Sequence, residues 1–222
     1  VGKKVKKRIC EQVYQAFGGN LYEVIIGGAA LNQEIESFLK DIDFPFTVGY
    51  GATECAPIIT YSDWHDFVPM SCGREVVHME VKIDSENPET VPGEILARGL
   101  NVMLGYYKND EATAQTIDKD GWYHTGDLGL MDKGGNVFIK GRSKNMLLGP
   151  NGQNIYPEEI EDKLNSMTFA MESVVVQRDG KLVGLVHPDF DEVHAMGLSR
   201  DDLQSLMEEN RVQVNANLPV YC

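Results

Sequence analysis

The sequence lacks the features of membrane-spanning, exported and zinc-binding proteins. It contains no run of about 18 uncharged apolar residues, so we expect no membrane-spanning helix. The basic start is not followed by the apolar core and cleavage site of a signal peptide. No two of the 5 histidines stand three or four positions apart, so no helix face offers a pair of zinc ligands.

Cysteine is scarce and irregularly spaced. The residues are Cys10, Cys55, Cys72 and Cys222, with no CxxC pair among them. A globular chain of 222 residues needs no cross-links for stability. We therefore expect reduced thiols and a cytoplasmic location.

Positive charge is also in short supply. The chain has 20 Lys and Arg residues against 34 Asp and Glu residues, a formal net charge of -14 at pH 7. This balance disfavours binding to nucleic acid. Any phosphate that the protein binds must therefore be held locally by backbone amides, a metal ion or a few placed cations.

The positive charge that is present is concentrated at the start of the chain. The cations there are Lys3, Lys4, Lys6, Lys7 and Arg8. Such a cluster can be a nucleic-acid arm. Apolar residues also recur there at helical spacing: Val5, Ile9, Val13, Ala16 and Phe17. We favour an amphipathic helix whose lysines face solvent and which ends at Gly18-Gly19.

The segment from residue 21 to residue 50 alternates strand and helix patterns. An apolar run at 21–26 predicts a strand, and 46–50 predicts a second one. Between them, Asn32 is the expected N-cap of a helix. Its inward face is predicted from Ile35, Phe38 and Leu39. This order is typical of an α/β unit with a parallel sheet.

Two further regions follow. Short strand patterns at 77–83, 93–98 and 136–139, separated by turn signals, predict a β-rich lobe. Beyond about residue 145 we expect a small α+β unit with a helix that opens at Pro157, a hairpin around Asp179-Gly180 and a final helix. Ser199 and Asp202 form a candidate capping box for that last helix. The apolar residues expected to face inward on the two helices are Ile160, Leu164, Met167, Leu203, Leu206, Met207 and Val214.

Four clusters of polar and small residues interrupt these patterns: residues 27–30, 50–54, 122–127 and 141–144. The first would let a flat ring approach the backbone, although small residues at such a turn also serve simple packing. In the second, Tyr50 could stack on a base, Thr53 could donate to a phosphate and Glu54 could hold Mg²⁺. Asp127 could accept hydrogen bonds from both ribose hydroxyls or be an ordinary turn aspartate. The fourth cluster supplies cations for ribose or phosphate.

Five motifs follow one another along the chain: YGATE, GEILARGLNVMLGYYKNDEAT, DGWYHTGD, FIKGRSKNM and NGQNIYPEEIE. In this order they resemble motifs of the adenylate-forming superfamily, and most closely those of its long-chain fatty acyl-CoA synthetases. In that family a carboxylic acid and ATP give an acyl-adenylate and pyrophosphate. A thiol, usually that of CoA, then displaces AMP. The resemblance implies ATP or AMP, Mg²⁺, CoA and a fatty acid as cofactors and substrates.

The resemblance also assigns the nucleotide-binding residues. Gly28 and Ala29 would line the adenine, Tyr50 would stack on it with Gly51 beside it, and Asp127 would hold the ribose diol. Together these residues would bind the adenosine part of ATP.

The remaining roles concern the phosphates and domain motion. Thr53 would contact the α-phosphate and Glu54 would ligate Mg²⁺. Arg142 would support the nucleotide, and Lys144, where many members have aspartate, would be the hinge of a mobile C-terminal domain. Residues 149–154 match the loop that the family brings to the thiol tunnel.

The resemblance predicts the domain organisation. Residues 1–144 would be the end of a large α/β plus β-lobe AMP-binding domain, and 145–222 most of a small α+β mobile domain. The family's upstream phosphate loop and its C-terminal lysine have no counterpart here. We therefore expect an internal piece of a larger enzyme that is inactive alone.

Some alternatives stay open at this point. One is an enzyme that loads the acyl group onto a carrier protein. Another is a non-catalytic nucleotide-binding module. A lipid substrate would also allow peripheral membrane association, and the chain length of the acid and the oligomeric state are undetermined.

Overall fold

A computed structural model describes residues 2–149 and 152–218. The chain forms two compact units, one ending at Lys140 and the next beginning at Gly141. The boundary lies inside strand β9 (Val137–Arg142), slightly before the position expected from Lys144. No helix within the described residues is long and apolar enough to cross a membrane.

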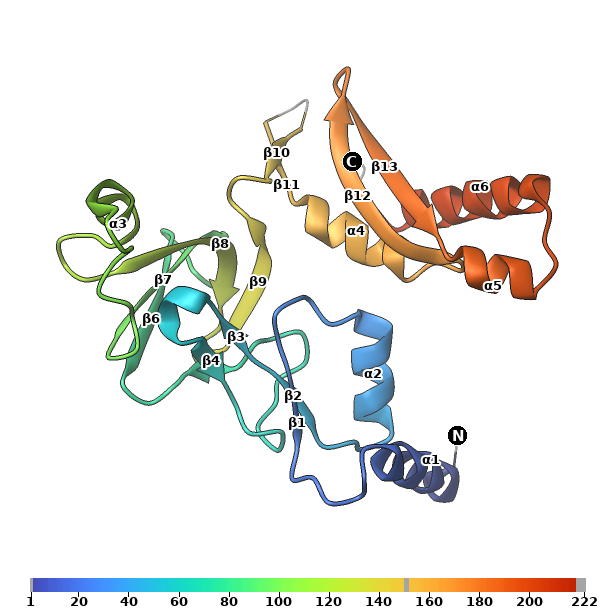
Figure 1. The fold of residues 1–222 in the computed structure, drawn as a ribbon, viewed down its shortest axis with the longest axis horizontal. Helices are drawn as coiled ribbons and strands as arrows, with labels where there is room; N and C mark the ends of the chain where they lie inside the picture. The colour runs from blue at the N-terminus through green and yellow to red at the C-terminus, as the bar shows by residue number, and fades with distance from the viewer. Residues whose placement is uncertain (1, 150–151, 219–222) are drawn as a thin grey trace. The chain divides into compact units, whose positions relative to one another are not determined.

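The first unit begins with the expected α/β alternation (Figure 1). Its elements are α1 (Lys3–Ala16), β1 (Val24–Ile26), α2 (Gln33–Asp41) and β2 (Phe46–Val48). Strands β1 and β2 pair in parallel, with Val24 opposite Phe46. The Asn32 side chain accepts hydrogen bonds from the backbone N–H groups of Glu34 and Ile35. The predicted parallel unit and its helix cap are therefore confirmed.

The predicted inward face of α2 is largely wrong. Ile35 is 51% exposed and Phe38 is 46% exposed, whereas Glu36 is only 6% exposed. Glu36 Oε1 accepts a 2.7 Å hydrogen bond from the backbone N–H of Met70. The helix therefore turns a carboxylate inward because a backbone donor in the loop after β4 requires an acceptor there. Leu39 alone of the three predicted residues packs against the core.

The rest of the first unit is rich in antiparallel strands. A three-stranded sheet contains β3 (Tyr50–Gly51), β4 (Ile58–Tyr61) and β5 (Arg74–Glu75). A four-stranded sheet contains β6 (Met79–Asp84), β7 (Gly93–Gly99), β8 (Tyr123–Met131) and β9. The predicted β-rich lobe is confirmed. Strand β8 and the short helix α3 (Asp110–Thr116) lie where the sequence predicted neither.

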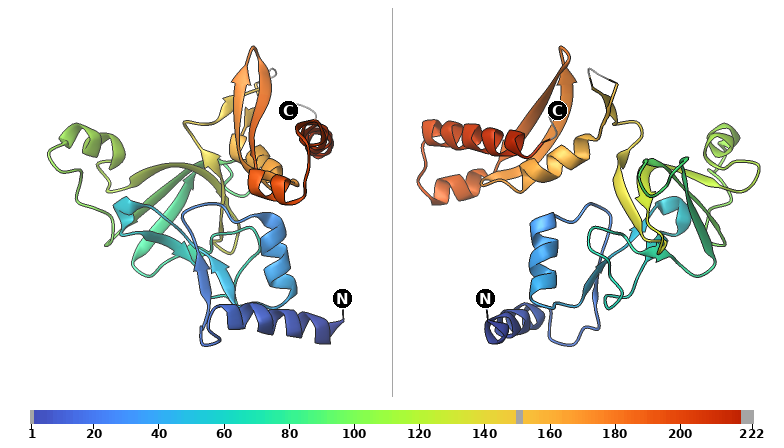
Figure 2. Two further views of the ribbon diagram at one scale, coloured as in Figure 1. Left: turned by 45° about the vertical axis from the view of Figure 1, so that its right-hand side comes forward. Right: turned by 180° about the vertical axis from the view of Figure 1, so that it is seen from behind.

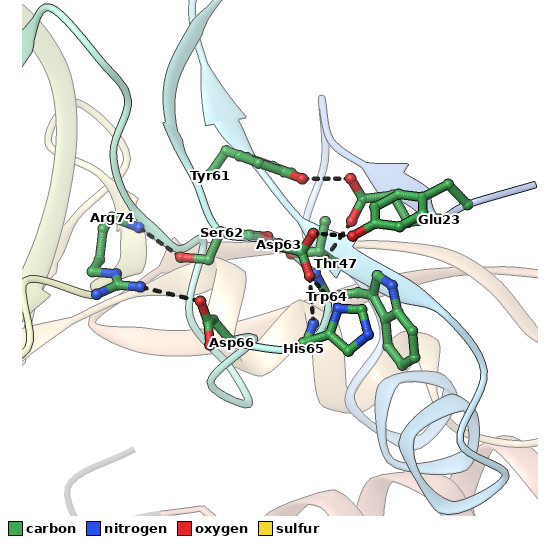
Figure 3. A network of polar contacts seen from close by, with 10 residues as sticks. Glu23, Thr47, Tyr61, Ser62, Asp63, Trp64, His65, Asp66 and Arg74 are labelled. Atoms are coloured by element: carbon green, nitrogen blue, oxygen red, sulfur yellow. Dashed lines mark hydrogen bonds and ion pairs between the residues drawn. The ribbon is translucent and has the colours of Figure 1, made fainter.

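A polar network joins the start of β1 to the loop that follows β4 (Figure 3). Glu23 accepts hydrogen bonds from the Tyr61 hydroxyl and from the backbone N–H of Trp64. Asp63 accepts from the Tyr22 hydroxyl at 2.7 Å and contacts Nδ1 of the His65 ring at 2.5 Å. The network fixes this loop against the parallel pair of strands.

The second unit is the predicted small α+β unit. Its elements are β10 (Leu147–Leu148), β11 (Asn154–Ile155), α4 (Pro157–Asn165), β12 (Ala170–Arg178), β13 (Lys181–Pro188), α5 (Phe190–Ala195) and α6 (Arg200–Ala216). Helix α4 packs against β12 of the hairpin (Figure 2). Ile160, Val175 and Val214 share the buried core of this unit.

Local signals in this unit are confirmed. Asp179 and Gly180 have φ values of 52° and 73°, and they join β12 to β13. Ser199 and Asp202 form the capping box of α6. Of the predicted thiol-tunnel loop at 149–154, residues 150 and 151 lie outside the described part of the chain.

Candidate functional site

Two glycine-containing loops lie side by side at the carboxyl edge of the parallel strands. The backbone N–H of Gly49, after β2, donates a 2.9 Å hydrogen bond to the carbonyl of Ile26 in β1. A Cβ atom on Gly27 would lie 3.1 Å from the carbonyl oxygen of Gly49. The two loops therefore run next to each other at the edge where open α/β sheets bind ligands.

The predicted adenine-lining residues are accessible at this edge. Gly28 and Ala29 are exposed in the loop between β1 and α2. Gly28 has φ +88°, and no atom lies within 4 Å of the position where its Cβ would be. Because the backbone there is uncovered, a flat ring could approach it closely.

Gly51 allows two backbone segments to approach each other closely. A Cβ atom at this position would lie 2.1 Å from the carbonyl oxygen of Pro57. That carbonyl also accepts a 2.9 Å hydrogen bond from the backbone N–H of Ala52. The close approach folds the chain back and forms the 3-10 turn Thr53–Cys55, which leaves Thr53 exposed.

Tyr50 and Asp127 bring the second and third motifs into direct contact. The Tyr50 hydroxyl donates a 2.6 Å hydrogen bond to Oδ2 of Asp127, and the two residues are only 8% and 7% exposed. Burial, followed by the charge of Asp127, raises the pKa of Tyr50, so the phenol stays a donor. Stacking of Tyr50 on adenine stays a prediction, and little of its ring area is exposed.

Asp127 is not a turn aspartate, as one interpretation of the sequence has it. It lies inside β8, and its backbone N–H donates to the Thr125 hydroxyl at 3.0 Å. The Thr125 hydroxyl donates to the carbonyl of Ile95 in β7. Asp127 is therefore held on a rigid strand, which suits a residue that must accept hydrogen bonds at a fixed position.

Sequence reasoning missed one acid that supports this motif. Glu94 of β7 accepts from the backbone N–H of Gly126 at 2.9 Å and contacts the His124 ring at 2.8 Å. Gly126 has φ +72°, so the chain bends there beside Asp127. Glu94 stands in the GEILARG motif, and its acidic side chain within an apolar strand was the signal available.

Glu54, the predicted Mg²⁺ ligand, has a defined environment. Its Oε1 accepts a 2.8 Å hydrogen bond from the Tyr106 hydroxyl. Burial and then the charge of Glu54 raise the pKa of Tyr123, which is 4% exposed. Within residues 2–149 and 152–218, no three His, Cys, Asp or Glu side chains form a metal-binding group. A single carboxylate fits Mg²⁺, which proteins often hold through one or two carboxylates together with substrate phosphates.

Arg142 and Lys144 belong to the second unit and lie on its exposed surface. Glu158, in the first turn of α4, accepts from the backbone N–H of Arg142 at 3.3 Å and from the Asn145 side chain at 2.7 Å. The carbonyl of Arg142 accepts from the backbone N–H groups of Asn145 and Met146. The predicted hinge residue is thus part of a turn tied to a helix start. Its hinge role stays a prediction.

Comparison with known proteins is consistent with this arrangement. Residues 3–107 match the family of AMP-binding enzymes. A long-chain-fatty-acid–CoA ligase of Escherichia coli is 37% identical over 178 residues, covering 78% of this chain and 28% of that protein. The 4-coumarate–CoA ligase 1 of Glycine max is 38% identical over 177 residues, covering 74% of this chain and 60% of that protein.

A solved structure extends the likeness to both units. The ATP-bound RpMatB-BxBclM chimera B1 matches with a TM-score of 0.75 and 26% sequence identity, over 99% of this chain and 44% of that chain. The chain thus spans less than two thirds of each of these three proteins. The sequence match, the motif order and the fold agree, and the chain belongs to the family of AMP-binding, adenylate-forming enzymes.

Proposed function

We propose that this chain supplies part of an ATP-dependent, AMP-forming ligase that joins a carboxylic acid to the thiol of CoA. The observation that carries the proposal is the hydrogen bond between Tyr50 and Asp127, which joins the YGATE and WYHTGD motifs across two sheets. Both relatives are named CoA ligases, which supports CoA as the acceptor of the acyl group.

In this proposal, different residues of the first unit bind different parts of ATP during adenylation. The acid's carboxylate oxygen attacks the α-phosphorus of ATP, and pyrophosphate leaves. Gly28, Ala29 and Tyr50 bind the adenine, with Gly51 shaping the turn, and Asp127 accepts hydrogen bonds from the ribose hydroxyls. Thr53 donates to the α-phosphate, so charge that develops there meets a positioned donor. Glu54 would hold Mg²⁺, which would neutralise negative charge on the phosphates.

The second unit serves the thiol step in this proposal. Rotation about Lys144 replaces one set of residues at the acyl-adenylate with another, and the CoA sulfur then attacks the acyl carbon and releases AMP. Arg142 supports the nucleotide. We propose a long-chain fatty acid as the substrate, a cytoplasmic location, and contact with membranes only through this lipid.

The test uses the full gene product that contains these residues. AMP release from ATP is measured with palmitate, octanoate or 4-coumarate, and with CoA or a phosphopantetheinyl carrier protein as the acceptor. We expect AMP and palmitoyl-CoA in equal amounts, with palmitate preferred. A preference for 4-coumarate would overturn the long-chain substrate. Acylation of the carrier protein in place of CoA would overturn the acceptor, and the absence of acid-dependent AMP would overturn the ligase.

A further inference from the structure

The segment between β7 and α3 contacts the turn that carries Thr53 and Glu54 at several points. Asn101 Nδ2 donates to the carbonyls of Cys55 and Ile58, at 2.7 Å and 2.8 Å. The backbone N–H of Met103 donates to the carbonyl of Glu54 at 2.7 Å. Both the backbone and the flanks of the turn are therefore fixed by residues about fifty positions away in sequence.

The same segment also fixes the Glu54 side chain. The Tyr106 hydroxyl donates a 2.8 Å hydrogen bond to Oε1 of Glu54. A phenol that donates to one carboxylate oxygen orients the whole carboxylate, because the group is planar.

Tyr106 is itself held in place from α3. Its backbone N–H donates to the Thr113 hydroxyl at 2.9 Å, and that hydroxyl donates to the carbonyl of Asn109 at 2.9 Å. A Cβ atom on Gly105 would lie 2.7 Å from Thr113 Cγ2, so only glycine allows this close approach. These contacts with α3 fix the backbone at Tyr106 and so orient its phenol.

We propose that Tyr106 is a positioning residue that holds the Glu54 carboxylate in the orientation in which it binds Mg²⁺ together with ATP. This inference rests on the function proposed above. The resemblance in motifs assigns no role to Tyr106. Tyr106 contacts the ligand Glu54 and neither the metal ion nor the reacting atoms. Partners of this kind typically contribute about 10–100-fold to metal affinity or activity.

The chain offers a matched control in the next residue. Tyr107 is 89% exposed, and its ring lies 5.2 Å from Nζ of Lys108. Tyr106→Phe and Tyr107→Phe remove the same hydroxyl from neighbouring positions of one loop. Only the first removes a contact to Glu54.

The first experiment is calorimetric titration of the full gene product with ATP, without acid substrate, in Mg²⁺ and in EDTA. In the parent protein we expect Mg²⁺ to tighten ATP binding. In Tyr106→Phe, the increase in ATP affinity caused by Mg²⁺ should be about 10–100-fold smaller than in the parent, with the affinity in EDTA unchanged. Tyr107→Phe should match the parent in both conditions. An undiminished gain in Tyr106→Phe, or none in the parent, overturns the inference. Failure of the parent to bind ATP in either condition overturns the proposed function as well.

A second experiment tests the contact without metal or nucleotide. Tyrosine ¹³Cζ shifts are recorded by NMR at neutral pH, and sequence-specific assignment identifies the signals of Tyr106 and Tyr107. Glu54→Gln should move the Tyr106 signal and leave the Tyr107 signal in place, because the Tyr106 hydroxyl donates to the Glu54 carboxylate. An unmoved Tyr106 signal in Glu54→Gln would overturn the positioning role even where Tyr106→Phe unfolds.

Discussion

Tyr50 and Asp127 lie 77 positions apart in sequence, and a 2.6 Å hydrogen bond joins them in the structure. Tyr50 begins β3 at the end of the parallel pair, and Asp127 lies in the four-stranded sheet. One buried contact therefore links the two sheets that carry the candidate nucleotide site. Its effect on stability and its effect on binding can be separated by the choice of variant.

Removal of the Tyr50 hydroxyl should lower stability. In Tyr50→Phe the buried Asp127 carboxylate loses a donor, which we expect to reduce the free energy of unfolding by about 1–3 kcal/mol. Urea unfolding followed by circular dichroism measures this loss. Tyr107→Phe, which changes an exposed ring, is the control. A Tyr50→Phe protein as stable as the control would show that this hydrogen bond does not contribute to the free energy of unfolding.

Glu36 gives a prediction that separates charge from hydrogen bonding. Glu36→Ala removes the acceptor of the Met70 N–H and should reduce the free energy of unfolding by about 1–3 kcal/mol. Glu36→Gln keeps an acceptor oxygen and removes the charge that burial disfavours, so it should be at least as stable as the parent at pH 7. Equal destabilisation by both changes would refute this reading of the site.

The same residue predicts a pH dependence. Burial raises the pKa of Glu36 above its ordinary value of 4.5. The folded state therefore binds this proton more tightly, and the resulting stability is complete below pH 4.5 and is lost as pH rises through the raised pKa. Urea midpoints measured across this range should fall with pH in the parent and lose that component in Glu36→Gln. Identical slopes in the two proteins would contradict the assignment.

Asp63 should act in the opposite direction at lower pH. The backbone N–H of His65, then the Tyr22 hydroxyl, lower the pKa of Asp63 from 3.8 to about 2. Its contribution to stability is therefore present above pH 3.8 and is lost as pH falls toward about 2.

The loop reports this change through its tryptophan. The Trp64 ring lies 3.8 Å from the His65 ring, between centroids. In a Trp122→Phe background, which leaves Trp64 as the only fluorophore of its kind, fluorescence should change between pH 4 and pH 2. Asp63→Asn should remove that change, and Asp66→Asn, next to Arg74, should preserve it. Retention of the transition in Asp63→Asn would rule out this carboxylate as its source.

Lys144 tests the proposed hinge. Proline at this position fixes φ near about −65° and also restricts residue 143, so Lys144→Pro should impair one half-reaction more than the other. Adenylate formation from ATP and thioester formation from supplied acyl-adenylate are measured separately in the full gene product. Lys144→Ala, which leaves the backbone free, should affect both steps little. Equal losses in Lys144→Pro would count against the hinge.

The features that the sequence predicted well depend on neighbouring residues. Asn32 caps its own helix, Asp179-Gly180 closes a hairpin between adjacent strands, and Ser199 pairs with Asp202 three positions later. Each signal needs only a few consecutive residues, so no knowledge of the distant chain is required.

The missed features depend on distant partners. The buried positions of β8 are Tyr123, Thr125, Asp127 and Gly129, so a mostly polar face points inward and hides the usual apolar alternation of a strand. Glu36 is buried because of a backbone N–H donor that lies 34 positions later. Motif order predicted which residues belong to the candidate site, whereas the supports of Asp127 and Glu54 became visible only in the structure.

The central claim is that Asp127 holds the ribose of a bound nucleotide. The most direct measurement is the affinity of AMP and of 2′,3′-dideoxy-AMP, determined by calorimetry for the parent, Asp127→Ala and the exposed-strand control Asp84→Ala. Two hydrogen bonds to a charged group contribute about 3 kcal/mol or more, so the parent and the control should prefer AMP by at least about 100-fold. In Asp127→Ala the two ligands should bind equally. A parent that does not distinguish them, or an undiminished preference in Asp127→Ala, would contradict the account.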